Sequence, residues 1–338
     1  MKRFALITLY VMIICTSCYK PGGEKTTHCP CFDRELSGFM VVDPTDDKSF
    51  VGIQNISFEN YPRVDGSTSA SILNTMVACK MLGVRYSWAT LVSEWFLQPF
   101  MDDYSFRNYF FHERIMTSQT HGAFMNLIDG NADIILTHRT ISHDEQAHAD
   151  SVGVALIETS IALDAFIFVV NKDNPVKTLT VNQIQGIYTK KITNWSQVGG
   201  NNSSIKVFTR PRNSGSEEVF KTLVMNGLEP ADFPEAAIGL MAWVFHEVTG
   251  NVNSICYSFN TYKNLQARKP CDEVPVLAIN DICPTETTIK NGKYPFISKV
   301  HVAIRSDLDR NSMAYKLYEW LQSEDAKSTI NECGFIPK

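Results

Sequence analysis

The chain has 338 residues, of which 44% are hydrophobic and 20% are charged, and its 31 basic and 36 acidic residues give a formal net charge of −5. These proportions are typical of a globular protein, and the length exceeds one average domain, which favours two lobes. The acidic balance and the lack of a basic stripe argue against a nucleic-acid-binding protein. A small anion is still an acceptable ligand, because salt screens the distant net charge and nearby donors then dominate.

Residues 1–17 are predicted to be a signal peptide. Lys2 and Arg3 precede an apolar run at residues 4–14 that is too short to span a membrane permanently. Small residues directly before a cysteine resemble the lipobox of bacterial lipoproteins, so Cys18 is expected to carry a lipid, although Cys15 stands where that motif usually has leucine. The alternative is a secretory peptide that is cut nearby without acylation. No later stretch is long and apolar enough for a transmembrane helix.

Residues 18–50 are polar, contain Pro-Gly-Gly, and are predicted to be a tether and an irregular segment. Of the nine cysteines, seven remain if Cys15 leaves with the signal and Cys18 is acylated, and an odd number cannot pair completely. Cys29 and Cys31 are too close for an easy mutual bridge, and no C-x-x-C pair indicates a zinc site. We therefore predict no particular disulfide, no metal and no cofactor.

Strands and helices are predicted to alternate in the first part of the chain. A short strand within residues 55–64 leads into the Asp-Gly-Ser-Thr-Ser segment at 65–69, and an amphipathic helix follows. Residues 83–112 are rich in aromatic side chains, which more often form core or packing between lobes than a ligand wall. A helix after residue 118 and a buried strand at 132–136 come next. Such alternation indicates parallel α/β units, in which ligands bind at the carboxyl ends of strands.

A second lobe is predicted to begin at the strongly apolar strand 163–170, which we interpret as a crossover between lobes. The lobe assignment is 51–162 plus 271–338 for the first lobe and 163–270 for the second. The elements expected after the crossover are a helix at 181–188, a strand at 205–208, a return strand at 274–279, and helices at 313–321 and 325–330.

Residues 210–220 are the most informative segment. Arg210 lies four residues before Ser214-Gly215-Ser216, and a helical pattern follows. A guanidinium, two hydroxyls and the free N–H groups of a helix start together can hold an oxyanion. The structural alternative is a capping box formed by Ser214 and Glu217. Segment 65–69 has similar chemistry, and its alternative is a turn followed by a cap. Two remote loops of one chemistry suggest a site shared between the lobes.

The order of several segments resembles that of the PstS family. They are the two loops above, Thr193-Asn194-Trp195, Val198-Gly199-Gly200 and the C-terminal Gly-Phe-Ile-Pro at 334–337. That family comprises the phosphate-binding lipoproteins of bacterial phosphate ABC importers. The resemblance runs from about residue 52 to the end and is weakest at residues 83–112. It implies an α/β type II periplasmic-binding-protein fold with two lobes, two crossover strands and a ligand cleft between the lobes.

The resemblance also implies a set of ligand-binding residues. Donors from the first lobe would come from the loops at the ends of its strands and from the start of its helix after residue 118, and Arg210 would be the cation. The phosphate-binding residues predicted in this way are Ser67, Thr68, Ser69, Thr120, alternatively Ser118, Arg139, Arg210, Ser214, Gly215 and Ser216.

His138 is a departure from the family pattern, because some members have a carboxylate at this position. That carboxylate would accept the proton of phosphate and repel sulfate, which carries none near neutrality, and selectivity of this kind depends on penalising the wrong ligand. Its absence puts strict phosphate selectivity in question and makes His138 a candidate discriminating residue. Asp65 is a second candidate acceptor, with an Asx-turn role as the alternative.

The predicted function is high-affinity binding of phosphate, or of a similar tetrahedral oxyanion, by a monomeric lipoprotein outside the cytoplasmic membrane, with delivery to an ABC permease and its ATPase. No catalytic residue is assigned. One alternative is a phosphate-ester hydrolase with Ser67 or Ser214 as nucleophile and His138 or His121 as base. Against it, the sequence shows no acid to orient either histidine and no metal-ligand cluster. Another alternative is a sensor or surface adhesin with the same fold.

Overall fold

The computed structural model describes residues 29, 41–91, 94–233, 238–239, 241–265 and 273–338. The predicted signal peptide, its Cys18, and all but Cys29 and residues 41–50 of the predicted tether lie outside the described residues.

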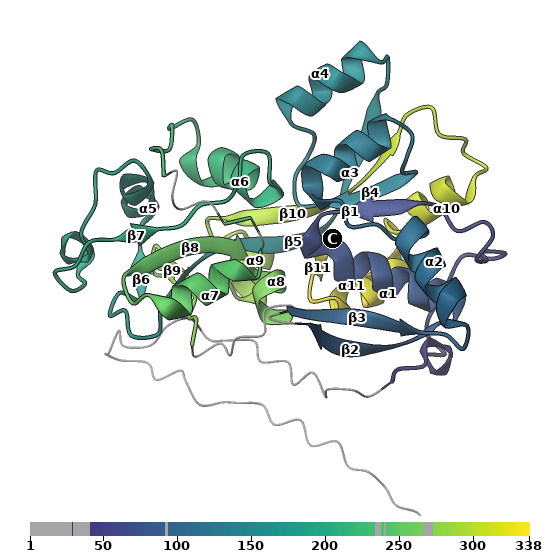
Figure 1. Cartoon of the computed structure of the whole chain (residues 1–338), viewed down its shortest axis with the longest axis horizontal. Helices are drawn as coiled ribbons and strands as arrows, with labels where there is room; N and C mark the ends of the chain where they lie inside the picture. Colours follow the sequence, from purple (N-terminus) through teal and green to yellow (C-terminus); the bar gives the residue numbers. More distant parts are fainter. Residues whose placement is uncertain (1–28, 30–40, 92–93, 234–237, 240, 266–272) are drawn as a thin grey trace, which may run out of the picture.

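Within this part of the chain, one seven-stranded mixed sheet passes through both lobes, with the order β1-β4-β10-β5-β8-β7 and with β11 paired to β5 (Figure 1). The parallel pairs β1–β4 and β7–β8 lie at its two ends, whereas the central pairs are antiparallel. The parallel α/β prediction therefore holds only at the ends. The strands are β1 (Val64–Gly66), β4 (Ile134–Thr137), β5 (Leu156–Val170), β7 (Lys206–Val207), β8 (Ser254–Phe259), β10 (Ile297–Arg305) and β11 (Ile336–Pro337).

The long strand β5 joins the two lobes. Its first part, up to Ala165, pairs with β10, and its last part, from Phe166, pairs with β8. The predicted crossover at 163–170 is thus the second half of a strand that begins at Leu156. In Figure 1, β5 and β10 run between a lobe that carries α5, α6 and α7 and a lobe that carries α1, α3 and α4.

The chain returns to the first lobe through β10, later than the boundary at residue 271 that the sequence suggested. The expected return strand at 274–279 instead bridges β5 at Val276, and its end, β9 (Ala278–Ile279), pairs with β6 (Thr178–Leu179). Residues from Val274 to Phe296 supply buried side chains to the core of the second lobe. An apolar run of this kind fits either core, so its sequence does not reveal the lobe to which it belongs.

The first lobe packs its helices on both faces of the β1–β4–β10 part of the sheet, because Ile134 and Leu136 of β4 join one hydrophobic cluster and Ile135 between them joins another. The face of α1 with Ile72, Leu73, Met76 and Val77 is buried, as its periodicity predicts. The hairpin β2–β3 contacts α1, and Phe110 lies in the same core, so the aromatic stretch contributes core residues. The elements of this lobe are η1 (Pro44–Asp46), η2 (Thr68–Ala70), α1 (Ser71–Leu82), β2 (Arg85–Leu91), β3 (Glu94–Phe100), α2 (Tyr104–Arg114), α3 (Gln119–Ile128), α4 (His143–Ser151), α10 (Met313–Trp320), η6 (Glu324–Ala326) and α11 (Lys327–Glu332).

The second lobe has a core rich in aromatic rings. Tyr257 of β8 stacks on Phe220 with ring centroids 4.7 Å apart, and Phe166, Phe168 and Tyr188 complete the cluster. The predicted helix at 181–188 is present and begins with a capping box at Thr180. The helices of the second lobe are α5 (Val181–Tyr188), η3 (Trp195–Val198), α6 (Gly215–Val219) with its π-helical continuation η4 (Phe220–Met225), α7 (Trp243–Gly250), α8 (Asn260–Leu265) and α9 (Glu286–Lys290).

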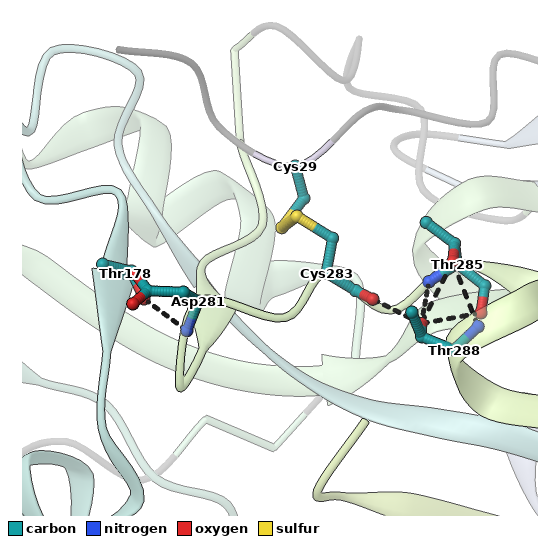
Figure 2. The surroundings of a disulfide bond; sticks show 6 residues. All are labelled: Cys29, Thr178, Asp281, Cys283, Thr285 and Thr288. Atoms are coloured by element: carbon teal, nitrogen blue, oxygen red, sulfur yellow. Dashed lines mark hydrogen bonds between the residues drawn. A yellow bond between two sulfur atoms is a disulfide. The ribbon is translucent and has the colours of Figure 1, made fainter. Parts of the chain in front are cut away.

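A disulfide joins Cys29 to Cys283, close to the threonines that cap α9 (Figure 2). This corrects the sequence analysis, which predicted no particular bridge. The two cysteines are 254 residues apart, and no local pattern indicates that they meet. Cys29 is buried in the core of the second lobe, so the bridge ties the start of the described chain to that lobe. Cys79 and Cys256 are free and buried, and Cys333 is also buried.

Candidate functional site

The loop after β1 turns tightly against the end of β4. A Cβ atom on Gly66 would lie 2.6 Å from the Leu136 carbonyl oxygen and 2.8 Å from Asn74 Nδ2, so this position requires glycine. The Ser67 N–H then donates to the Leu136 carbonyl at 3.0 Å, and η2 begins at Thr68. The first N–H groups of a helix lack intrahelical acceptors and lie at its positive end, so this loop offers donors to an anion.

Asp65 is buried, and its carboxylate is already occupied by protein donors. It accepts hydrogen bonds from the N–H of Gly66 at 2.7 Å, the N–H of Ser118 at 2.9 Å and the side-chain amide of Asn126 at 2.7 Å. These contacts connect the β1 loop to the start of α3. The carboxylate therefore has a positioning role, which extends the turn interpretation of the sequence.

Three side chains from separate segments form a buried hydrogen-bonded chain at this edge of the sheet. Ser69 Oγ lies 2.9 Å from His138 Nδ1, and His138 Nε2 lies 3.3 Å from Asp164 Oδ2. The imidazole also packs against the ring of Phe259 at a tilt of 33°, with centroids 4.1 Å apart. The expectation that no acid orients His138 is therefore wrong, because Asp164 does so from β5. The charged residue within the apolar run 163–170 was the signal that could have identified it.

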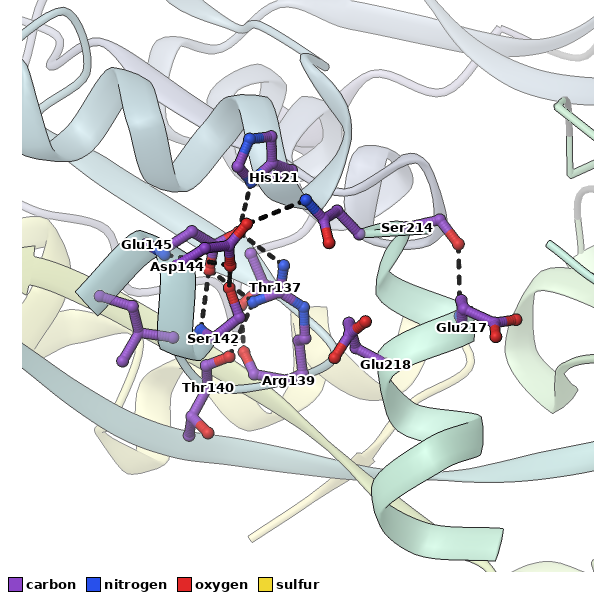
Figure 3. A network of polar contacts seen from close by, with 12 residues as sticks. His121, Thr137, Arg139, Thr140, Ser142, Asp144, Glu145, Ser214, Glu217 and Glu218 are labelled. Carbon is purple, nitrogen blue, oxygen red and sulfur yellow. Dashed lines mark hydrogen bonds and ion pairs between the residues drawn. The ribbon is translucent and has the colours of Figure 1, made fainter. Parts of the chain in front are cut away.

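Arg139 is paired with an acid inside the first lobe. Its Nη1 and Nη2 each lie 2.7 Å from a carboxylate oxygen of Glu145 (Figure 3). The guanidinium also lies over the ring of Phe124, 5.1 Å from its centroid. Glu145 also lies 2.9 Å from His121 Nδ1, so an acid orients this histidine too. Burial alone would raise the pKa of Glu145, but the hydrogen bonds and charge of Arg139 outweigh burial and lower it. The predicted capping box at Ser142 is present and includes the same glutamate.

The start of α3 brings Thr120 to the boundary between the lobes. Ser118 precedes the helix, and its hydroxyl accepts a hydrogen bond from Asn126 at 3.1 Å. Gln119 has a positive φ of 63°, which side chains seldom adopt and which often marks a functional loop. Thr120 is buried. Ser118 thus holds the turn, whereas Thr120 faces the second lobe.

In the second lobe, Arg210 is held by neutral groups. Its Nε donates to Ser216 Oγ at 3.3 Å and its Nη1 to the Ile238 carbonyl at 2.6 Å. Burial lowers the pKa of Arg210, although nearby acidic groups oppose this. The carboxylate of Glu217 is turned toward the hydroxyl of Tyr257, which donates to it. Burial raises the pKa of Glu217, although the hydrogen bond from Tyr257 opposes this.

The predicted capping box at Ser214 forms only in part. Ser214 Oγ accepts the N–H of Glu217 at 3.2 Å, but the Glu217 side chain bonds to Tyr257 rather than returning to the cap. Ser214 and the beginning of α6 lie opposite the Arg139–Glu145 group in Figure 3.

The two lobes meet where α3 contacts α6. A Cβ atom placed on Gly215 would lie 2.2 Å from Thr120 Oγ1, so Thr120 occupies the space that a side chain at 215 would need. Beside this contact, Asn213 Nδ2 donates to Asp144 Oδ2 at 2.9 Å. The sequence did not predict this interlobe hydrogen bond, because the two residues are 69 positions apart and only the fold brings them together.

The predicted residues therefore form two groups that approach each other. Ser67, Ser69 and His138 belong to one hydrogen-bonded group in the first lobe, and Thr120 contacts Gly215 from the second. Within the part of the chain that the structure describes, no three His, Cys, Asp or Glu side chains are grouped to hold a metal ion.

Residues 86–325 match the PBP superfamily domain, so the chain belongs to the periplasmic-binding-protein superfamily. Within that class, it is similar to phosphate-binding proteins named PstS. It is 26% identical to PstS of Bacillus subtilis (strain 168) over 54% of this chain and 58% of that protein, and 25% identical to PstS of Borreliella burgdorferi over 53% of this chain and 65% of that protein. The alignments thus cover less than two thirds of either relative.

Solved structures agree on the fold. A putative phosphate ABC transporter substrate-binding protein from Clostridium perfringens, with bound phosphate, has a TM-score of 0.60 and 21% identity, and covers 84% of this chain and 99% of its own. An ABC-type phosphate transport receptor from Vibrio cholerae has a TM-score of 0.56 and 24% identity, and covers 84% of this chain and 100% of its own. The predicted two-lobed fold and the resemblance to PstS proteins are confirmed.

Proposed function

We propose that this protein binds inorganic phosphate, or a similar tetrahedral oxyanion, and delivers it to an ABC importer made of a permease and its ATPase. The observation that carries the proposal is Arg210, a buried guanidinium whose acceptors among the described residues, Ser216 and the Ile238 carbonyl, are both neutral. A buried charge without an ionic partner is costly, and a bound anion would compensate it.

In this proposal the donors that a desolvated dianion needs come from the starts of three helices, with Ser69 contributing its backbone N–H. Thr68 and Ser69 lie at the start of η2, Thr120 at the start of α3, and Ser214, Gly215 and Ser216 at the start of α6. Each charge-assisted hydrogen bond contributes about 1.5–3 kcal/mol net. Because these donors come from both lobes, the anion would stabilise the arrangement in which Thr120 contacts Gly215, and that arrangement is what a membrane partner would recognise.

Arg139 takes a different role in this proposal from the one the family resemblance suggested. Both of its terminal nitrogens are bound to Glu145, so it holds the loop after β4 in place rather than contacting phosphate. Ser67 supports Ser69, to which it is hydrogen-bonded at 3.2 Å, and Ser118 supports the α3 turn.

The proposed setting is the outer side of the cytoplasmic membrane, where the protein acts as a monomer anchored by a lipid on Cys18. The PstS relatives and the positively charged, apolar N-terminus support this setting. Among the described residues, no helix is both long enough and apolar enough to cross a bilayer.

The hydrolase alternative gains an acid from the structure, since Asp164 and Glu145 orient the two histidines. Ser67, the first proposed nucleophile, is buried, and its hydroxyl lies 3.2 Å from that of Ser69 rather than beside a histidine. The other proposed nucleophile, Ser214, caps α6 and lies within hydrogen-bond distance of the Glu217 N–H rather than of a histidine.

Isothermal titration calorimetry of the purified protein tests the proposal. We expect a measurable heat of binding with inorganic phosphate, submicromolar affinity and a stoichiometry of about one, as a single charged site of this kind predicts. Absence of heat with phosphate, arsenate and sulfate would overturn it. Turnover of a chromogenic phosphate ester that is lost in Ser67→Ala or Ser214→Ala would favour the hydrolase instead.

A further inference from the structure

We propose that the buried Ser69–His138–Asp164 chain fixes the Ser69 hydroxyl as a hydrogen-bond acceptor, so that the site selects an oxyanion that carries a proton. The chemical consequence is preference for monohydrogen phosphate over sulfate without a carboxylate in contact with the ligand. This inference rests on the proposed phosphate-binding function and identifies the residues that set its selectivity.

The first step is the orientation of Asp164. Its Oδ1 accepts hydrogen bonds from the N–H groups of Ala165 at 2.7 Å and Thr261 at 3.1 Å, which leaves Oδ2 facing His138 Nε2 at 3.3 Å. A carboxylate can only accept hydrogen bonds. The proton of a neutral imidazole at His138 must therefore reside on Nε2, and Nδ1 carries a lone pair.

The second step is the orientation of Ser69. A bare Nδ1 accepts the Ser69 O–H across the 2.9 Å contact, so the one proton of that hydroxyl is committed to the histidine. The remaining lone pairs of Ser69 Oγ then point elsewhere, with Ser67 Oγ at 3.2 Å as one neighbour. Toward a ligand, Ser69 Oγ presents an acceptor, whereas a hydroxyl that is free to rotate would present a donor.

Burial keeps this arrangement from relaxing. The His138 side chain is 1% exposed and packs against the rings of Phe259 and Phe335, with centroids 4.1 and 5.6 Å away. Water therefore has little access to replace one partner of the chain, and a fully satisfied buried network specifies one arrangement.

The third step is the ligand. Phosphate near neutral pH retains a proton on an oxygen, which can donate to Ser69 Oγ, whereas sulfate has only acceptor oxygens. An acceptor facing an acceptor leaves a buried polar group unpaired, and we expect this to disfavour sulfate by roughly 10- to 100-fold. The same reasoning applies to arsenate, which is protonated like phosphate and should bind with phosphate rather than with sulfate.

The substitution Asp164→Asn tests the orientation directly. The two backbone donors at Oδ1 keep the amide oxygen in its place, so the amide NH₂ faces His138 Nε2 and donates to it. The imidazole proton must then move to Nδ1 and donate to Ser69 Oγ, and the Ser69 O–H becomes a donor toward the ligand. We expect phosphate affinity to fall by roughly 10- to 100-fold while sulfate affinity is retained or rises.

The measurements are calorimetric titrations with phosphate and with sulfate, and the ¹⁵N chemical shifts of the His138 ring. Wild-type protein should show a protonated Nε2 and a bare Nδ1, and Asp164→Asn should show the reverse. Ser298→Ala is the matched control, because Ser298 is buried on β10 directly opposite Asp164 but is not part of the hydrogen-bonded Ser69–His138–Asp164 chain. It should leave both affinities and the ring shifts unchanged.

The inference is overturned if the wild-type ring carries its proton on Nδ1, or if Asp164→Asn leaves the ratio of phosphate to sulfate affinity unchanged. Should Asp164→Asn not fold, Ser69→Ala removes the acceptor without altering the carboxylate and must also lower that ratio. Failure of the proposed function would look different, since the wild-type protein would then bind neither anion.

Discussion

Two buried arginines, one in each lobe, differ in what holds them. Arg139 and Arg210 are each 8% exposed, and each follows closely on the carboxyl end of a strand. Arg139 forms a bidentate pair with Glu145, whereas the acceptors of Arg210 within the described part of the chain are a hydroxyl and a carbonyl. A guanidinium matched to a carboxylate has its charge compensated by the fold, and one held by neutral acceptors retains it for a ligand.

The second lobe also contains a carboxylate near its arginine, but this carboxylate is hydrogen-bonded to a tyrosine and not to the guanidinium. Glu217 lies on the first turn of α6, but its side chain is engaged by the Tyr257 hydroxyl, which is fixed in the aromatic core by stacking on Phe220. Tyr257 also accepts the N–H of Arg210 at 3.0 Å. One tyrosine therefore positions the arginine backbone and diverts the nearby acid, which keeps the positive charge available.

The largest expected effect is a loss of stability when the buried ion pair of the first lobe is broken. Arg139→Ala leaves Glu145 buried without its guanidinium, and loss of one partner of a buried ion pair destabilises by about 3–5 kcal/mol. Chemical denaturation should measure this decrease in the free energy of unfolding. The double variant Arg139→Met/Glu145→Leu replaces both charges by apolar groups and should recover most of it. A double variant no more stable than Arg139→Ala would contradict a structural role for the pair.

The corresponding change in the second lobe should act on binding. Arg210→Gln removes the cation of the proposed site but, among the described residues, leaves no buried carboxylate newly unpaired, since Glu217 keeps Tyr257. We expect phosphate affinity to fall by about 1.5–3 kcal/mol, or roughly 10- to 150-fold, with a much smaller change in stability. Calorimetry checks the first and denaturation the second.

Arg212→Gln is the matched control, because Arg212 is exposed, lies two residues away and loses the same charge. If it weakens phosphate binding as much as Arg210→Gln, the effect comes from the general field around α6, and the distinction between the two buried arginines is lost.

The sequence predicted what depends on neighbouring residues. The helix at 181–188, the buried face of α1 and the capping box at Ser142 are confirmed, because periodicity and caps are local. The loops at 65–69 and 210–216 were found for the same reason. Their assignment as ligand-binding loops stays a prediction.

What the sequence missed depends on partners that only the fold brings together. His138 meets Asp164 from 26 residues away, and Asp164 meets Thr261 from 97 residues away. The Cys29–Cys283 bridge and the membership of residues 274–279 in the second lobe are of the same kind. An arginine beside a strand end looks alike in both lobes until its acceptor is known, which is why Arg139 and Arg210 were grouped together.

The contact between the lobes provides the last and smallest test. Gly215→Ala places a methyl group 2.2 Å from Thr120 Oγ1 and 3.1 Å from Thr120 Cβ. Rotation of the threonine relieves the first overlap but withdraws its hydroxyl from the site, and the second still requires the lobes to separate slightly. Overpacking of this kind costs about 1–3 kcal/mol, and here the cost falls on the arrangement that binds the anion, so phosphate affinity should decrease by that amount.

The free energy of unfolding of ligand-free Gly215→Ala should change less than its free energy of phosphate binding, because separated lobes avoid the overlap. Gly250→Ala is the control, since its new Cβ meets no atom within 4 Å at the end of α7. Equal losses of affinity in the two variants would mean that α3 and α6 do not need to approach each other for binding. A loss confined to Gly215→Ala would mean that binding requires the close approach of α3 and α6 at this glycine. Arg210 and the hydroxyls of the first lobe would then act on one ligand only in that arrangement.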